Sequence, residues 1–241
     1  MVRYKACLVA QGFSQVPGVD YFDTYAPVAR LAFIRTVLAF AAAEDLETGQ
    51  IDIKGAYLNG ELAENEVIYM KQAPGYAVKG SDGKAKVARL WKSIYGLKQS
   101  GRRWYQKLVE IMTKLKFLRS EVDSAVFYRR DELLRLLIIV LVHVDDCSIA
   151  GRPKKLIQKL KLQIQKFVEI TDLGELHWIL GLEVKHIRKN KRIMLSQQSY
   201  IDSILRCYRF DNAKLVSTPM DTNIHLNSAQ SPTTTEEFAK M

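Results

Sequence analysis

Two adjacent aspartates, Asp145 and Asp146, stand between a long apolar run, Leu136 to Val142, and a short one, Ile149 to Ala150. Consecutive side chains on a strand point to opposite faces, so both carboxylates can reach one site only if the backbone turns sharply there. The pair is therefore predicted at the tip of a β-hairpin. Carboxylates between buried strands need a cation or a proton, which favours a divalent metal site; a solvated Asp-Asp turn is the alternative.

A third carboxylate, Asp52, lies near the end of a short alternating segment that stops at Gly55. This pattern predicts a strand over residues 48–53, with Asp52 near its carboxyl end. Two metal ions about 4 Å apart, held by carboxylates from separate strands, are a recurrent device for in-line attack on a phosphoryl group. Asp52, Asp145 and Asp146 together could supply it.

The composition fits a sizeable folded body with a polyanionic partner. The chain has 241 residues, of which 48% are hydrophobic, and this is ample for one core with subdomains. Its formal charge is +10 and its sequence pI is near 9.4, which favours nucleic acid over a membrane as the partner. A basic surface that serves only solubility is the alternative.

Cysteines and apolar runs bear on the compartment. Cys7, Cys147 and Cys207 are odd in number, far apart and outside any C-x-x-C spacing, so neither a disulfide framework nor a zinc site is supported. No signal peptide is recognisable, and the longest apolar stretch, Leu133 to Val142, contains Arg135 and is too short to span a bilayer. We expect an intracellular protein, cytoplasmic or nuclear, with no membrane partner.

Periodicity predicts a chain in which strands and helices alternate. The apolar and alanine-rich segment over residues 31–46 predicts a helix buried on most sides. Helical spacing of large apolar residues predicts amphipathic helices over 102–117 and 155–169. The lysines of the latter, Lys161 among them, are expected to face away from its apolar stripe, either solvated or in contact with nucleic acid. The other predicted elements are strands over 4–10, 66–70, 87–92, 177–187 and 192–195 and a short helix over 198–207.

Seven segments match one family in order, from Lys5 to about Pro219. They are Lys5 to Phe13; Tyr25 to Arg30; Asp52 to Gly60; Ser93 to Gln99 with Arg103 to Tyr105; Val144 to Asp146; Asp172 to Leu176 with Leu180-Gly181; and Ser217 to Pro219. Each segment is weak alone, but their collinear spacing is specific. The chain resembles the reverse transcriptase domain of copia-type long-terminal-repeat retrotransposons.

The resemblance implies an α+β fold: a polymerase palm, with an antiparallel sheet backed by helices, together with fingers and a partial thumb. The domain is expected over residues 1–216, with the thumb starting at about residue 196. A poorly ordered tail is expected over 217–241. The chain is expected to be a fragment of a polyprotein whose integrase and ribonuclease H regions lie outside it.

The resemblance also implies the chemistry. Asp52, Asp145 and Asp146 match the catalytic, metal-binding aspartates, which would hold two Mg²⁺ ions, with Mn²⁺ as a possible substitute. Deoxynucleoside triphosphates would be added to a primer 3′-OH on an RNA or DNA template, with release of pyrophosphate. A catalytically inactive, truncated remnant that only binds nucleic acid is the alternative.

Further positions match the family's substrate contacts. Tyr57 matches the steric gate that excludes a ribose 2′-OH, and Gly96 matches a glycine of close backbone approach. Leu180 and Gly181 either grip the primer end or form an ordinary β-turn. The full set of implied substrate-binding residues is Lys5, Tyr57, Gly96, Lys98, Gln99 and His143.

Three places depart from the residues usual in the family. Cys7 stands where arginine is usual, and a thiol cannot bind phosphate as a planar guanidinium does. His143 replaces a tyrosine; it is smaller and titrates near neutral pH, but its ring can still pack against primer and template. Ser100 and Gly101 stand where Ala-Pro is usual, which is expected to loosen the start of the following helix.

Overall fold

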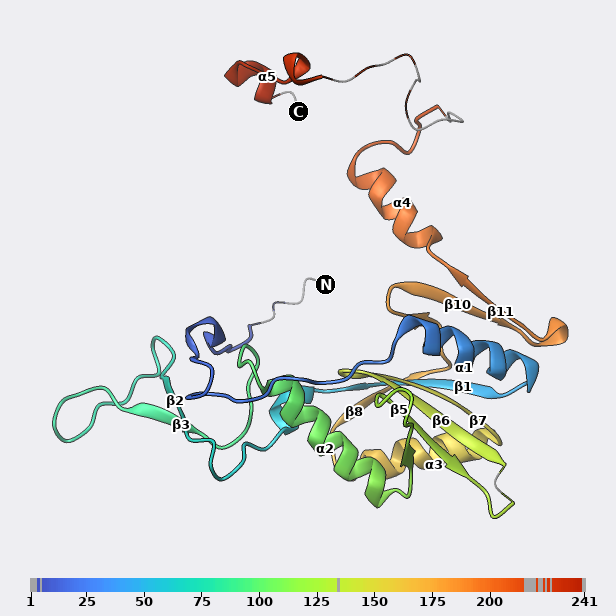
Figure 1. Ribbon diagram of the computed structural model, residues 1–241, viewed down its shortest axis with the longest axis horizontal. Coiled ribbons are helices and arrows are strands. Elements are labelled where there is room, and N and C mark those ends of the chain that lie inside the picture. The colour runs from blue at the N-terminus through green and yellow to red at the C-terminus, as the bar shows by residue number, and fades with distance from the viewer. Residues whose placement is uncertain are drawn as a thin grey trace. The chain divides into compact units, whose positions relative to one another are not determined.

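A six-stranded antiparallel sheet forms the centre of residues 1–197, the first of two units in a computed structural model of the chain (Figure 1). The structure describes residues 4, 6–133, 135–214, 220, 223, 225 and 227–239. In spatial order the strands are β4 (Leu118–Arg119), β5 (Val126–Arg130), β6 (Leu136–His143), β7 (Asp146–Gly151), β1 (Glu47–Ile53) and β8 (Ile170–Gly174). The strand β1 therefore lies between β7 and β8.

Alternation along the strands divides their side chains between the two faces of the sheet. Ile51 and Ile53 of β1 are buried on one face, where they share a core with Trp104. Asp52, between the two isoleucines, must point to the other face. Two helices cover the face that holds the isoleucines, α2 (Ser100–Lys114) and α3 (Lys154–Ile164).

The other face of the sheet is covered by a helix and a small second sheet. Ile139 of β6 and Ala150 of β7 are buried there in one cluster with Ile34 and Val184. Burial on both faces explains why the sequence of β6 is almost continuously apolar. The covering elements are α1 (Leu31–Ala43) and a sheet in the order β11 (Arg192–Ser196), β10 (Leu182–Ile187) and β9 (Trp178–Ile179).

Shorter elements complete the two units. In the first unit they are η1 (Gly12–Ser14), η2 (Ala56–Asn59), β2 (Ile68–Lys71) paired with β3 (Val87–Leu90), and η3 (Arg188–Asn190). The second unit, residues 198–241, contains α4 (Gln198–Cys207), η4 (Ser228–Gln230) and α5 (Thr235–Ala239). No helix in the described ranges combines the length and apolar character needed to cross a bilayer.

Several elements differ from the sequence-based predictions. The helix expected over 155–169 ends at Ile164, and the strand expected over 177–187 is divided into β9 and β10. Residues 6–10, expected as part of a strand, have no regular structure, although the Ala10 N–H donates to the Tyr95 carbonyl at 2.8 Å. The first helix ends at Ala43 and is buried along one side, where Ile34 lies, rather than on most sides. Its many alanines made the exposed side look apolar, because alanine is compatible with either environment.

Lys161, expected to face away from the core, is instead buried. Its ammonium group donates to the carbonyls of Gln50 at 3.2 Å and Gly174 at 3.0 Å, and it pairs with the Asp172 carboxylate. It lies beside Gly49, where a Cβ would come within 3.3 Å of the lysine nitrogen. The lysine therefore joins α3 to both β1 and the edge strand β8.

The Asp172→Asn substitution is expected to make stability less dependent on pH in acid. Burial by itself raises the pKa of Asp172, but the Lys161 ammonium and the Gly174 N–H outweigh it and hold the pKa below its ordinary value. The carboxylate therefore stabilises the fold above the unfolded-state pKa, and this stabilisation disappears as the pH falls through the folded-state pKa. Urea unfolding of both proteins from about pH 6 to about pH 3 tests this, and a constant difference in stability would contradict it.

Candidate active site

The Asp145-Asp146 pair lies at the tip of a β-hairpin, as the sequence predicts. The strand β6 ends at His143, β7 begins at Asp146, and these two residues face each other across the ladder. Val144 and Asp145 form the two-residue turn between them. Val144 has a φ of +62°, a conformation that β-branched residues rarely adopt. The backbone is therefore strained directly beside Asp145.

Two hydrogen bonds from other elements hold this strained turn. The Trp104 indole N–H donates to the Val144 carbonyl at 2.7 Å. The Ile53 backbone N–H donates to the Asp145 carbonyl at 2.9 Å. The turn is thereby tied both to the helix layer and to β1, the strand that carries Asp52.

The Trp104→Phe substitution is expected to lower the free energy of unfolding by about 1–3 kcal/mol, because the part-buried Val144 carbonyl loses its donor. Urea unfolding measures the change. The matched control is Trp178→Phe, which alters a tryptophan that is 46% exposed. Equal stability of the two variants would mean that the indole hydrogen bond does not hold the turn.

Asp52 lies directly opposite Asp146 in the ladder between β1 and β7. Directly opposed residues of antiparallel strands share a face, with Cβ atoms about 4.5–5.5 Å apart. His143 faces Asp146 from the other neighbouring strand. Asp52, Asp146 and His143 therefore form one row across three adjacent strands, and Asp145 lies in the turn at the end of that row.

The three aspartates concentrate negative charge at this end of the sheet. Burial raises the pKa of Asp146, a hydrogen bond from the Gln50 amide at 2.8 Å lowers it, and the charges of Asp145 and Asp52 raise it again; the net pKa is raised. Among the described residues none of the three carboxylates forms a salt bridge. In that part of the chain, no ion pair therefore offsets the repulsion between them.

The donor set suits an oxygen-preferring divalent cation in kind and in charge. The Nδ1 atom of His143, in the same row, is buried and has no hydrogen-bond partner in the part of the chain that the structure describes. Within that part, however, no three His, Cys, Asp or Glu side chains already form a group that could hold a metal ion. The types of residue therefore suit a cation, but their side chains do not converge on one point as metal ligands do.

Two tyrosines stand beside the carboxylates. Tyr57 lies in η2, directly after β1, and its ring packs against Tyr95 with ring centroids 4.9 Å apart. Burial, followed by the charge of Asp145, raises the pKa of both phenols. Both therefore remain neutral hydrogen-bonding groups near Asp145 at physiological pH.

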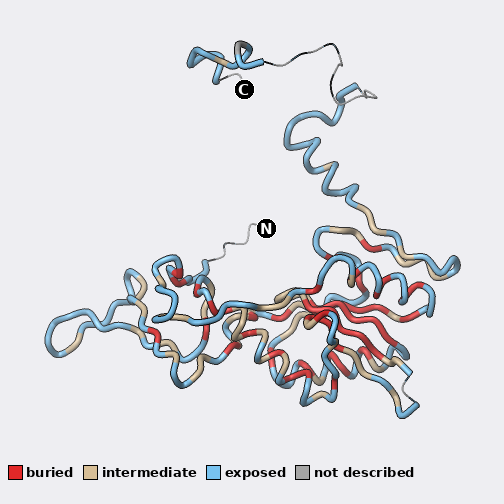
Figure 2. Tube along the Cα trace, viewed as in Figure 1, coloured by how far each residue is buried: buried red, intermediate tan, exposed pale blue. Residues whose placement is uncertain are grey.

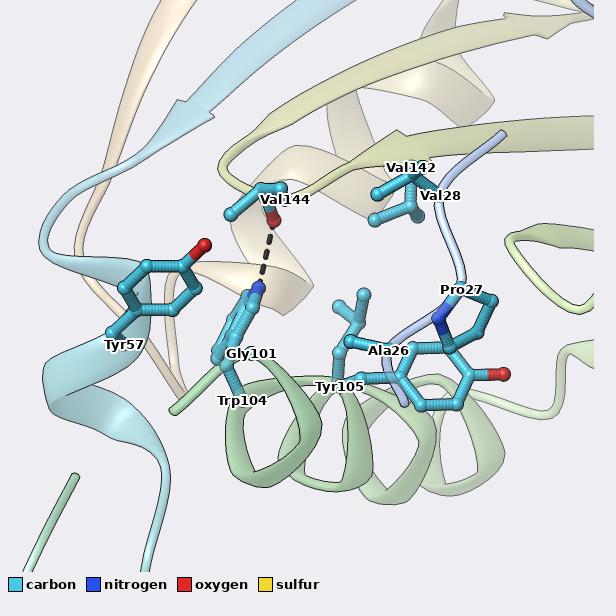
Figure 3. A pocket seen from close by; sticks show the side chains of 10 residues that line it. Ala26, Pro27, Val28, Tyr57, Gly101, Trp104, Tyr105, Val142 and Val144 are labelled. Carbon is cyan, nitrogen blue, oxygen red and sulfur yellow. Dashed lines mark hydrogen bonds between the residues drawn. The ribbon is translucent and has the colours of Figure 1, made fainter. Parts of the chain in front are cut away.

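A small pocket of about 140 Å³ lies beside the turn (Figure 3). Figure 3 shows Tyr57 at one end of it and the Trp104 bond to Val144 in its wall. Gly101, in the first turn of α2, also lines it, and a Cβ there would lie 3.3 Å from the Ala26 Cβ. The helix α2 begins at Ser100, so the two residues that stand where Ala-Pro is usual lie in its first turn.

Gly96 was predicted to allow a close approach of backbone to a ligand. In the structure, the backbone of another segment of the chain, at Ala10, lies against it. Gly96 has a φ of +94°, and a Cβ there would lie 2.0 Å from the Ala10 carbonyl oxygen. A Cβ at Gly12 would in turn lie 1.9 Å from the Gly96 carbonyl oxygen. Two glycines thus let the N-terminal segment cross the turn that carries Tyr95.

The neighbouring predicted residues, Lys98 and Gln99, are placed differently from each other. The Gln99 amide is fully buried, donates to the Asp20 carbonyl at 3.0 Å and accepts from the Gln15 amide at 3.2 Å. Lys98 is exposed, and its backbone N–H donates to the Gln15 side-chain carbonyl at 2.8 Å. The Lys98 side chain is open to a ligand, whereas the Gln99 side chain is occupied by the fold.

Leu180 and Gly181, predicted to contact the primer end, lie about 35 residues after the Asp145-Asp146 hairpin in the sequence. Leu180 and Gly181 form the two-residue turn between β9 and β10, with φ values of +50° and +76°. Positive φ at both positions is typical of a tight hairpin turn. Leu180 is 41% exposed and so remains available for contact. Lys5, predicted to face the triphosphate, lies outside the described residues.

Three residues of the site were missed by the sequence-based predictions. Gln50 is two residues before Asp52 and so shares its face of β1, a signal that strand alternation could have given. Trp104 was assigned only to the helix core, although a buried indole N–H needs an acceptor. Tyr95 carried no signal of its own, because nothing in its spacing predicts the contact with Tyr57.

An antiparallel sheet backed by helices, with this hairpin between two of its strands, confirms the predicted palm type of α+β fold. Residues 1–222 match the family described as Reverse transcriptase (RNA-dependent DNA polymerase). The chain belongs to this family.

Similar proteins agree with that assignment. The chain is 41% identical over 241 residues to the Retrovirus-related Pol polyprotein from transposon TNT 1-94 of Nicotiana tabacum, covering all of this chain and 18% of the relative. It is 36% identical over 218 residues to the Pol polyprotein from transposon RE1 of Arabidopsis thaliana, covering 90% of this chain and 14% of the relative. The predicted resemblance to copia-type reverse transcriptase domains is confirmed, and the chain spans less than a fifth of these polyproteins' length.

Among solved structures, telomerase from Candida Tropicalis in complex with a fragment of telomeric RNA is similar, with a TM-score of 0.43 and 12% sequence identity. The match covers 73% of this chain and 34% of that chain.

Proposed function

We propose that this chain is an RNA-directed DNA polymerase domain of a copia-type retrotransposon, which adds deoxynucleotides to a primer 3′-OH on an RNA or DNA template. The observation that carries the proposal is the position of Asp52, directly opposite Asp146 and beside the turn that holds Asp145. Membership of the family and the charge of +10 support it, because a basic protein attracts the phosphate backbone. The Pol polyprotein names of the relatives support an origin within a polyprotein, in which we propose that integrase and ribonuclease H regions accompany this domain.

Asp52, Asp145 and Asp146 are proposed to hold two Mg²⁺ ions, which Mn²⁺ could replace. When bound, the ions supply charge stabilisation for the attacking and leaving oxygens. The chain itself does the positioning: Gln50 orients the Asp146 carboxylate, and the bonds to the Val144 and Asp145 carbonyls fix the turn. The strain at Val144 is consistent with a turn held for function rather than for stability.

The two neutral phenols beside Asp145 are proposed to border the site of the incoming nucleotide. Tyr57 would exclude a ribose 2′-OH, and Tyr95, which packs against it, would keep its ring in place. The other proposed contacts are Lys5, Gly96, Lys98, Gln99 and His143 for template and nucleotide, and Leu180 with Gly181 for the primer end.

The Tyr57→Val substitution is expected to raise ribonucleotide use relative to deoxynucleotide use by about tenfold to a hundredfold, because a smaller side chain admits the extra hydroxyl. Single-nucleotide extension with each substrate measures the ratio of specificity constants. Tyr25→Val, which changes a tyrosine that is 67% exposed, is the control. An unchanged ratio in the Tyr57 variant would remove the steric role.

Primer extension tests the proposed function. The purified chain, a DNA primer annealed to an RNA template and the four deoxynucleotides are incubated with Mg²⁺ and, separately, with Mn²⁺. We expect template-directed extension that a chelator abolishes and that Asp52→Asn lacks. Extension equal to that of Asp52→Asn in both metals would overturn the proposal and leave a nucleic-acid-binding relative without polymerase activity.

A further inference from the structure

The two-stranded ribbon of β2 and β3 has two chemically different faces. Its inner face, with Ile68, Met70 and Leu90, packs on Ala10 and Leu97. Strand alternation turns the residues between these to the other side, where they are exposed. We call this side the outer face of the ribbon; it comprises Tyr69, Lys71, Val87, Arg89 and the next alternating residue after β3, Trp91.

The outer face presents large aromatic rings to solvent. Trp91 is 70% exposed and Tyr69 is 60% exposed. The Arg89 guanidinium lies 4.2 Å from the centroid of the Trp91 ring, and Arg89 is directly opposite Tyr69 in the ladder. A single exposed aromatic residue needs no explanation, but here two lie on one face of the ribbon beside an arginine that stacks on one of them. Figure 2 shows this ribbon almost entirely as exposed or half-buried chain.

The ribbon and the loop that joins its strands are strongly basic. Residues 68–92 contain six basic side chains and a single acidic one, Asp82. All six basic residues are exposed, so their charge acts on the solvent rather than on the core. The six are Lys71, Lys79, Lys84, Lys86, Arg89 and Lys92. This excess of positive charge favours a polyanionic partner over an apolar or a basic partner.

We propose that the outer face of the ribbon binds single-stranded nucleic acid, with bases stacked on Trp91 and Tyr69 and phosphates held by the surrounding lysines. Aromatic rings combined with basic side chains are the chemistry of sequence-tolerant single-strand binding. Paired bases in a duplex do not expose their faces to such rings. Tyr69 and Lys71 also line a groove of about 600 Å³ along the edge of β2, which extends the surface available to a strand.

This surface shares no residue with the candidate active site and requires no metal. It therefore goes beyond the proposed polymerase activity, and its test can be run with a chelator present. Failure of one does not decide the other, because Trp91 and Tyr69 belong to the ribbon whereas Asp52, Asp145 and Asp146 belong to the proposed metal site.

Fluorescence anisotropy of a labelled single-stranded oligothymidylate of about 12 nucleotides measures binding to the full chain. The Trp91→Ala substitution is expected to weaken binding by about fivefold to a hundredfold, the usual loss for one stacked base. Trp91→Phe, which keeps a ring, should retain most of the affinity. The matched control is Phe238→Ala, which removes an aromatic side chain that is 63% exposed in α5.

Salt dependence separates stacking from charge. Lys71→Ala is expected to reduce the slope of log affinity against log salt concentration by about 0.7, the value for one phosphate contact on a single strand. Trp91→Ala should weaken binding at every salt concentration without changing the slope. Circular dichroism of each variant verifies that the fold is kept. We expect this for the Trp91 variants because the Trp91 side chain is 70% exposed.

Three results would overturn the inference. The first is an affinity of Trp91→Ala no lower than that of Phe238→Ala. The second is an equal loss of affinity for a blunt duplex of the same length, which would assign the ribbon to backbone binding alone. The third is self-association of the parent chain that Trp91→Ala abolishes while oligonucleotide binding stays unchanged, which would make the outer face a contact between copies.

Discussion

Asp145→Asn is expected to reduce Mg²⁺-dependent primer extension by about a hundredfold to a thousandfold, the order of loss when one preorganised electrostatic group of an active site is removed. The amide keeps the size of the side chain and removes its charge. The Asp145 carbonyl bond to Ile53 belongs to the backbone and should survive. The variant therefore separates the chemistry of the carboxylate from the structure of the turn.

The control for this experiment is Asp131→Asn. Asp131 pairs with Arg135 near the start of β6, away from the hairpin tip in the ladder. We expect it to retain extension within a factor of about three, as a surface change usually does. Activity of Asp145→Asn within tenfold of the parent would contradict the proposed role, provided that both variants unfold at the same urea concentration.

Gly96→Ala is expected to destabilise the fold by about 3 kcal/mol or more. Part of this comes from placing a Cβ at a φ of +94°, which costs roughly 1–2 kcal/mol at a non-glycine residue. The larger part comes from the Ala10 carbonyl oxygen, which would lie 2.0 Å from the new atom, so the backbone must move. Urea unfolding measures the total.

Gly75→Ala isolates the conformational contribution. Gly75 has a similar φ of +84°, but a Cβ there would meet nothing within 4 Å. Its substitution should therefore cost only the conformational part, about 1–2 kcal/mol. Equal destabilisation at the two glycines would show that the crossing of Ala10 over Gly96 does not constrain the chain.

The sequence predicted those parts of the fold that follow from local periodicity. The apolar run before Asp145 and the alternation around Asp52 placed β6, β7 and β1 correctly, because burial on a sheet leaves a strong pattern. The helix α4 was predicted with its observed bounds from the same kind of signal. The prediction that the aspartate pair forms a hairpin tip needed only the rule that consecutive side chains alternate.

Long-range polar contacts could not be predicted in this way. Lys161 looks like a solvated lysine in its own helix, and only the carbonyls of Gln50 and Gly174 explain its burial. The Trp104 bond to Val144 and the packing of Tyr95 on Tyr57 likewise join segments whose spacing carries no information about their contact. Such contacts become visible only once the strands and helices are arranged in space.

Direct binding of Mn²⁺, followed by the relaxation of water protons, tests most directly whether Asp52, Asp145 and the hairpin form one cation site. The parent chain and Asp131→Asn are expected to bind the ion equally, whereas Asp52→Asn and Asp145→Asn should each weaken binding by about tenfold or more, since each removes an anionic oxygen ligand. Unchanged Mn²⁺ affinity in both of the latter variants would contradict a shared metal site at the end of β1 and β7.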